Sequence, residues 1–154
     1  MSNYLGEYEV TLDPKGRFMV PVGFKRQLPE AESVRFVLNR GLDKCITLYT
    51  VSQWEEVSVV VKKLNEFNEK ARIFKRTFLN GATFMEPDSA GRLLLPKSML
   101  EYAGIKKDMV FSVQMNKVEI WDAPTFRALS ENVDMNTLAG EVLGGNYLNP
   151  FERI

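Results

Sequence analysis

The sequence predicts an α+β fold in which two copies of one hairpin-based unit close a small β-barrel flanked by helices. The motif Asp-x-x-Gly-Arg-x-x-x-Pro occurs twice, as DPKGR before Pro21 and as DSAGR before Pro96. Short apolar alternations flank each motif, as is typical of strands around a turn. Because isolated two-stranded ribbons are marginal in water, two units that interlock and cover each other's edges are favoured.

The repeat extends beyond the motif itself. At an offset of 75 positions the motif residues align in pairs: Asp13 with Asp88, Gly16 with Gly91, Arg17 with Arg92, and Pro21 with Pro96. Farther along, CITLY at 45–49 aligns with KVEIW at 117–121 at an offset of 72. The change of offset places a three-residue length difference in a loop, where such changes are tolerated.

Each copy is expected to contain two hairpins around a short helix. In the first copy, YEVTL and RFMVP are predicted strands on either side of the DPKG turn. Pro21 suits the first turn of a helix, because its missing N–H has no partner there. VRFVLNR and CITLY form the second predicted hairpin. The second copy repeats this order, and Gly104 lies just beyond its helix as a C-terminal glycine should.

Helices are predicted between and after the copies. Apolar residues recur at three- and four-residue steps from Val51 to Phe67, and the SQWE segment has the spacing of a capping box from Ser52 to Glu55. A break is expected at Asn65 and Asn68, after which the stripe continues to Gly81. We therefore divide the chain into a first module (7–54), connecting helices (55–82), a second module (83–126) and a C-terminal helix with an acidic tail (127–154).

Composition excludes several functional classes. With 45% apolar and 26% charged residues the chain has the mixture of a soluble globular protein, without a membrane-spanning segment. It contains no histidine, which excludes Ser-His-Asp and Cys-His catalysis and histidine metal sites. The single cysteine, Cys45, permits no intrachain disulfide and is compatible with a reducing cytoplasm. We expect no enzyme activity, no metal and no cofactor.

The paired signatures LDPKGRFMVP and GRLLLP, with the helices after Tyr49 and Trp121, resemble the MraZ family of bacterial regulators. The resemblance runs from Tyr4 to Phe126. It implies two AbrB-like swapped-hairpin modules in one pseudo-twofold barrel. It also implies a homo-oligomeric ring that binds tandem short repeats in double-stranded promoter DNA, at the head of the division and cell-wall gene cluster. Such a regulator would be cytoplasmic and associated with the nucleoid.

The first motif carries the candidate DNA contacts. Residues 13–26 have a net charge of +3, although the whole chain is neutral. We expect Arg17 to face DNA with Lys15, and Asp13 to orient the turn, in which Gly16 supplies a positive φ. Lys25 and Arg26 are either phosphate contacts or solvated charge. The alternative reading is that Asp13 and Arg17 form only an exposed ion pair of small energetic value.

The second motif is less basic. Ala90 stands where the first copy has Lys15, Glu86 precedes the turn, and residues 86–97 sum to zero charge. Asp88 and Gly91 are expected to orient this turn as their counterparts do. We hypothesise that the two turns are unequal and that the 13–17 turn dominates contact, with Arg92 either assisting DNA binding or serving oligomer packing.

A second class of function remains open at this point. The chain could be a ring-forming scaffold that binds other proteins without direct DNA readout. Part of the apolar stripe on the connecting helices is expected to meet a neighbouring subunit, since one small barrel covers only part of two such helices.

Overall fold

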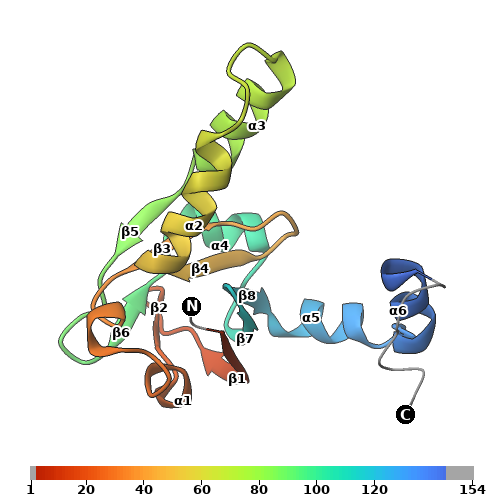
Figure 1. Ribbon diagram of the computed structural model, residues 1–154. Coiled ribbons are helices and arrows are strands. Elements are labelled where there is room, and N and C mark those ends of the chain that lie inside the picture. The colour runs from red at the N-terminus through yellow and green to blue at the C-terminus, as the bar shows by residue number, and fades with distance from the viewer. Residues whose placement is uncertain (1–2, 145–154) are drawn as a thin grey trace. The chain divides into compact units, whose positions relative to one another are not determined.

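The computed structural model describes residues 3–144 of the chain (Figure 1). The chain forms two compact units, Met1–Ala123 and Pro124–Ile154. The first unit contains both copies of the repeat and the helices between them. The second contains most of α5 (Ala123–Ser130) and all of α6 (Met135–Leu143), which Asp134 caps by accepting hydrogen bonds from backbone N–H groups. The predicted α+β class is confirmed.

The two copies contain strands and helices in the same order. The first copy contains β1 (Tyr4–Thr11), β2 (Arg17–Met19), α1 (Val22–Lys25), a 3-10 turn (Glu30–Glu32), β3 (Phe36–Arg40) and β4 (Ile46–Thr50). The second contains β5 (Thr83–Met85), β6 (Arg92–Leu94), α4 (Lys97–Ala103), β7 (Asp108–Met115) and β8 (Val118–Asp122). The connecting segment forms α2 (Val51–Lys62) and α3 (Glu69–Leu79).

The strands of the two copies interlock. Within the described residues, one antiparallel sheet has the order β1-β7-β8-β4-β3-β5, and β2 pairs with β6 in a separate ribbon. Strands β1 to β4 of the first copy correspond to β5 to β8 of the second. When each strand is replaced by its counterpart, the β1–β7 pair becomes the β5–β3 pair, and the β3–β4 pair becomes the β7–β8 pair. The β4–β8 and β2–β6 pairs map onto themselves. The strand pairing therefore has the twofold symmetry that the duplication predicts.

Two details differ from the sequence-based expectation. The first strand–turn–strand of each copy is not an ordinary hairpin, because β2 pairs with β6 instead of β1. In addition, β1 and β5 remain at opposite ends of the six-strand order, so inter-strand hydrogen bonds do not close the predicted barrel over residues 3–144. Pro21 and Pro96 follow β2 and β6 closely and have no N–H to donate, which keeps this ribbon short and separate.

Both copies contribute to one hydrophobic core. The rings of Phe18 and Phe24 lie with their centroids 5.9 and 5.2 Å from that of Phe111, which belongs to the other copy. The remaining large side chains that are fully buried also come from both copies: Phe36, Leu38, Ile46, Leu48, Leu93, Leu95, Met99, Met109 and Ile120. Neither copy alone could bury these side chains, which gives a physical reason for the duplication.

The N-terminal cap of helix α2 lies two residues earlier than predicted. The capping box is formed by Thr50 and Gln53: the Thr50 hydroxyl oxygen accepts from the Gln53 N–H at 3.2 Å, and the Thr50 N–H donates to Gln53 Oε1 at 3.0 Å. Because β4 continues directly into α2, the last strand residue becomes the cap, and Ser52 instead donates to Glu32. The predicted break is confirmed, since Asn68 caps α3.

The apolar stripe of the connecting helices is only partly covered. Trp54 packs on Tyr49 with a centroid distance of 5.4 Å and stacks on Phe78 at 6.1 Å. Farther along, Phe74 is 46% exposed and Phe67 is 96% exposed. In Figure 1, α3 extends beyond the sheet that α2 covers. The first unit therefore leaves an apolar surface on α3 without cover from its own residues.

Candidate nucleic-acid interface

One carboxylate organises the first turn. Asp13 Oδ1 accepts from the backbone N–H groups of Lys15 and Arg17, both at 2.9 Å, and Oδ2 accepts from Arg17 Nε at 2.9 Å. The N–H of Asp13 donates to the Arg17 carbonyl at 2.7 Å, and that of Gly16 donates to the Asp13 carbonyl at 3.0 Å. Gly16 has a φ of 82°, which glycine adopts without strain. The motif spacing therefore builds a closed turn that also holds the arginine side chain.

The second turn repeats these contacts atom for atom. Asp88 Oδ1 accepts from the N–H groups of Ala90 and Arg92 at 3.0 and 2.9 Å, and Oδ2 accepts from Arg92 Nε at 2.8 Å. The Gly91 N–H donates to the Asp88 carbonyl at 2.9 Å, and Gly91 has a φ of 85°. The two turns thus share one geometry despite their different sequences.

These hydrogen bonds lower the pKa of both aspartates. The largest cause is the hydrogen bond from the arginine backbone N–H, that of Arg17 on Asp13 and that of Arg92 on Asp88, while desolvation of the carboxylates opposes it. Each aspartate is therefore ionised at pH 7 and offsets the charge of its own arginine. Any net positive charge at a turn must come from other cations nearby.

The β2–β6 ribbon places both arginines on one surface. Its register forms the cross-strand pairs Arg17–Leu94, Phe18–Leu93 and Met19–Arg92. Side chains alternate between the two faces of a strand, and directly opposite residues share a face. Since Phe18 and Leu93 are buried in the core, Arg17 and Arg92 point outward together. Their side chains are 25% and 38% exposed, and ordinary strand geometry separates their Cα atoms by about 8 Å.

The other predicted cations are distributed over both turns. Lys15 is exposed at the first turn, and Arg26 is exposed at the residue after α1. Lys25 is half-buried, and its Nζ lies against the second turn, 3.5 Å from the position that a Cβ on residue 91 would take. The structure therefore groups Lys15 with Arg17, and Lys25 with Arg92. The sequence comparison did not foresee the second of these groupings.

Sequence reasoning also missed a cation beside the first turn. The carbonyl of Lys107 accepts from the Leu12 N–H at 2.9 Å, which places this exposed lysine next to the residue that precedes Asp13. The two residues belong to different copies and meet only through the β1–β7 pairing. In the sequence, only the two consecutive lysines at 106 and 107 indicate that this segment could add positive charge to a binding surface.

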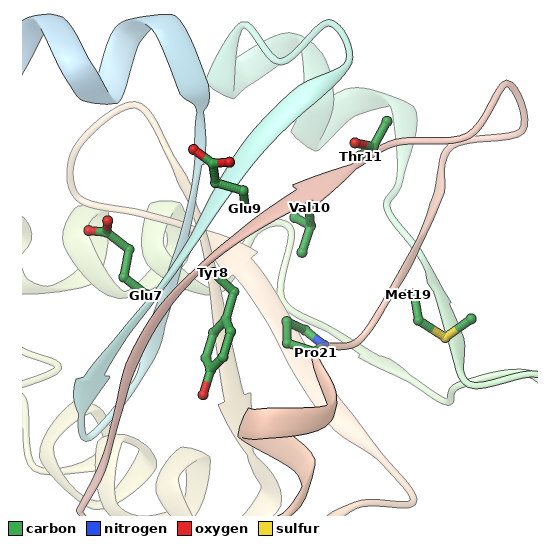
Figure 2. A pocket seen from close by; sticks show the side chains of 7 residues that line it. All are labelled: Glu7, Tyr8, Glu9, Val10, Thr11, Met19 and Pro21. Carbon is green, nitrogen blue, oxygen red and sulfur yellow. The ribbon is translucent and has the colours of Figure 1, made fainter.

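A hollow adjoins the ribbon. Figure 2 shows this hollow, of about 600 Å³, between β1 and the segment from Met19 to Pro21. Glu7 and Glu9 from β1 contribute to its wall. In Figure 2 the carboxylates of Glu7 and Glu9 point to the side of β1 opposite Met19 and Pro21, so they do not face the ribbon.

Outside the two turns, the described residues contain little that indicates a catalytic, metal-binding or membrane-spanning role. Burial raises the pKa of the Cys45 thiol to about 12, so the thiol is protonated at neutral pH and is a poor nucleophile. Within residues 3–144, no group of three or more acidic, cysteine or histidine side chains is arranged to hold a metal ion. Among the helices of this region, none is both long enough and apolar enough to span a bilayer.

Comparison with known proteins identifies one family. The family described as "MraZ protein, putative antitoxin-like" matches residues 4–77 and again residues 78–141. The transcriptional regulator MraZ of Cytophaga hutchinsonii is 39% identical over 127 residues, covering 82% of this chain and 84% of its own. That of Christiangramia forsetii is 38% identical over 149 residues, covering 95% and 96%. That of Clostridium botulinum is 39% identical over 137 residues, covering 88% and 94%.

Structural similarity to a solved protein is weak. The solution structure of PHS018 from Pyrococcus horikoshii covers 75% of this chain and 95% of its own at 13% identity, with a TM-score of 0.32. This similarity is too low to bear on the fold. The two-copy family match and the relatives named above confirm the resemblance inferred from the paired motifs.

Proposed function

The chain belongs to the MraZ family, and from this premise we propose that it is a transcriptional regulator that binds double-stranded DNA sequence-specifically. Its sites would be short tandem repeats in promoter DNA, including the promoter of its own division and cell-wall gene cluster. The observation that carries the proposal is the β2–β6 register, which directs Arg17 and Arg92 outward on one face. Such a protein would act in the cytoplasm, on the nucleoid.

The two turns would divide the work of recognition between their residues. Arg17 and Arg92 are each held at Nε by an aspartate, which leaves the two terminal nitrogens of the guanidinium for a base edge or a phosphate. Lys15, Lys25 and Arg26 would contact phosphates. The paired aspartates and glycines of the motif would hold the turns in shape.

The architecture would be that of two AbrB-like modules with exchanged hairpins. Residues 7–54 and 83–126 would form the modules and residues 55–82 the connecting helices. Residues 127–154 would form the C-terminal helix and acidic tail, of which residues 145–154 lie outside the described residues. The exchange of β2 and β6 between copies supports this arrangement. The closed, pseudo-twofold barrel of such modules would then be completed by side-chain packing, in place of a continuous ladder of hydrogen bonds.

Assembly into a homo-oligomeric ring would compensate for a small contact surface. Each chain has few cations at the two turns, so a single chain would bind one DNA site weakly. Several copies bound along tandem repeats gain affinity through effective concentration. The exposed apolar side chains on and just before α3, Phe74 and Phe67, support an interface between copies.

DNA binding can be measured by fluorescence anisotropy with a duplex taken from directly ahead of the chain's own gene. Several phosphate contacts predict a linear fall of log K with log salt, and footprinting on the same duplex locates the bound repeats. Arg17→Ala should abolish most of the affinity, whereas Lys63→Ala, which removes an exposed cation at the end of α2, should not. Ring formation without any binding to this duplex would instead support the scaffold function.

A further inference from the structure

We infer that Lys25, which belongs to the first copy, acts at the turn of the second copy, where it supplies the phosphate-binding lysine that this turn lacks. The inference rests on the proposed function and assigns a specific partner to one residue. The first turn has its own lysine, Lys15, two residues before its arginine. The second turn has Ala90 at the corresponding position, so its own sequence provides no lysine.

The core fixes the position of Lys25 beside the second turn. Lys25 is the last residue of α1, and the preceding Phe24 is 1% exposed in the shared core. The core therefore fixes the helix, and the lysine side chain reaches the other copy. A Cβ on Gly91 would lie 3.5 Å from Lys25 Nζ and 3.4 Å from Met19 Sδ. Both are ordinary contact distances, so the ammonium group lies directly beside the second turn.

The twofold counterpart of Lys25 is apolar. Leu100 stands 75 positions later, and its Cδ1 lies 3.9 Å from the place that a Cβ on Gly16 would take. The first turn therefore has a lysine in its own loop and a leucine from the other copy. The second turn has an alanine in its own loop and a lysine from the other copy. At these equivalent positions, each turn therefore has one arginine and one lysine, and the first turn also has Lys107 near it.

The charge of Lys25 is available for a ligand. Asp88 forms its ion pair with Arg92, with 2.8 Å between Oδ2 and Nε. Among the ion pairs formed within residues 3–144, none involves Lys25. Without Lys25, the Asp88–Arg92 pair would give the second turn no net positive charge. With it, the turn presents an uncompensated ammonium group beside an outward-facing guanidinium.

The ligand class that fits this pair is the phosphodiester backbone of DNA. A lysine contacts phosphate as a point charge and carries no base preference, whereas an arginine can also read a base edge. The second turn would then contact the duplex with an arginine and a lysine, as the first turn does, which argues against the sequence-based hypothesis that the first turn dominates.

The test uses the full-length protein and the duplex from ahead of its own gene. Lys25→Ala should weaken binding about fivefold, as much as Lys15→Ala, and should lower the slope of log K against log salt by about one. Lys63→Ala is the matched control, because it removes an exposed lysine at the end of α2 and should have little effect. Thermal melting confirms folding, and Lys25→Gln replaces the alanine variant if that variant fails to fold.

A relocated lysine makes the test specific to the second turn. Ala90→Lys, at an exposed position, should restore most of the affinity of Lys25→Ala but add little to the wild type, because both lysines serve the same phosphate. The inference would be overturned if Ala90→Lys raised the DNA affinity equally in the wild type and in Lys25→Ala. It would also be overturned if Lys25→Ala bound DNA as tightly as Lys63→Ala does. Both outcomes leave the proposed function intact. If the wild type itself shows no salt-dependent binding, the proposed function fails, and the inference fails with it.

Discussion

The turns at residues 13–17 and 88–92 have nearly the same hydrogen bonds, but they obtain their charge in different ways. In both, one aspartate accepts from two backbone N–H groups and from the arginine Nε, and a glycine adopts a positive φ. The first turn has a lysine within its own loop. The second has Ala90, and its neighbouring lysine comes from α1 of the other copy.

This difference separates two requirements of a binding loop. The shape of the turn depends on residues within five positions of one another, so both copies must encode it locally. The electrostatic potential depends on every charge nearby in space, whichever copy provides it. A duplicated protein whose copies interlock can therefore lose a cation from one loop and recover it from another element.

The largest expected effect concerns the two arginines. Arg17→Ala and Arg92→Ala should each weaken binding to the upstream duplex roughly tenfold to a hundredfold, because each removes a contact to a base edge. Fluorescence anisotropy at fixed salt measures both. Similar losses are expected from two turns that each have an arginine and a lysine. A loss confined to Arg17→Ala would instead support the hypothesis that the first turn dominates.

The glycines test whether the two turns are equally constrained. Gly16→Ala and Gly91→Ala should each lower the free energy of unfolding by about 1–2 kcal/mol, because both require a left-handed backbone conformation. Chemical denaturation measures the change. Ser89→Ala, at an exposed position of the second turn, should change little. Gly16→Asn should cost less than Gly16→Ala, since asparagine tolerates positive φ better, and a reversed order would contradict the strain argument.

The smallest expected effect is a dependence of stability on acid pH. The pKa of Asp13 and of Asp88 is lower in the folded chain than in the unfolded chain, so their contribution is complete above the ordinary aspartate pKa of 3.8. It is lost as the pH falls through the lowered folded values. Melting temperatures from pH 7 to pH 2 should therefore fall less steeply for Asp13→Asn/Asp88→Asn than for the wild type. Parallel curves would show that the two turns contribute nothing to the acid sensitivity.

Local features were predictable where their determinants are close in sequence. The aspartate, glycine and arginine of each motif indicate a turn, and the structure contains it twice. The break before α3 was likewise visible, because Asn68 caps the helix within three residues. The cap of α2 was misplaced at Ser52, since the choice between Thr50 and Ser52 depends on where β4 ends, and the sheet determines that position.

Features that depend on contact between the copies could not be predicted residue by residue. The β2–β6 pairing brings together Arg17 and Arg92, which are 75 positions apart. Lys25 and Gly91 are also remote in sequence, and nothing in either motif indicates that they meet. The position of Lys107 beside the first turn depends on the β1–β7 register in the same way.

By itself, the sequence determined that this protein contains a duplicated unit, two arginine-bearing turns of one geometry, and no histidine chemistry. Only the tertiary structure decided which face the arginines share and which cations accompany each of them. The physical reason is the distance along the chain over which each kind of interaction acts. Turn geometry follows from hydrogen bonds and φ angles among adjacent residues, whereas a charged surface sums contributions from elements that meet only when the core of both copies has formed.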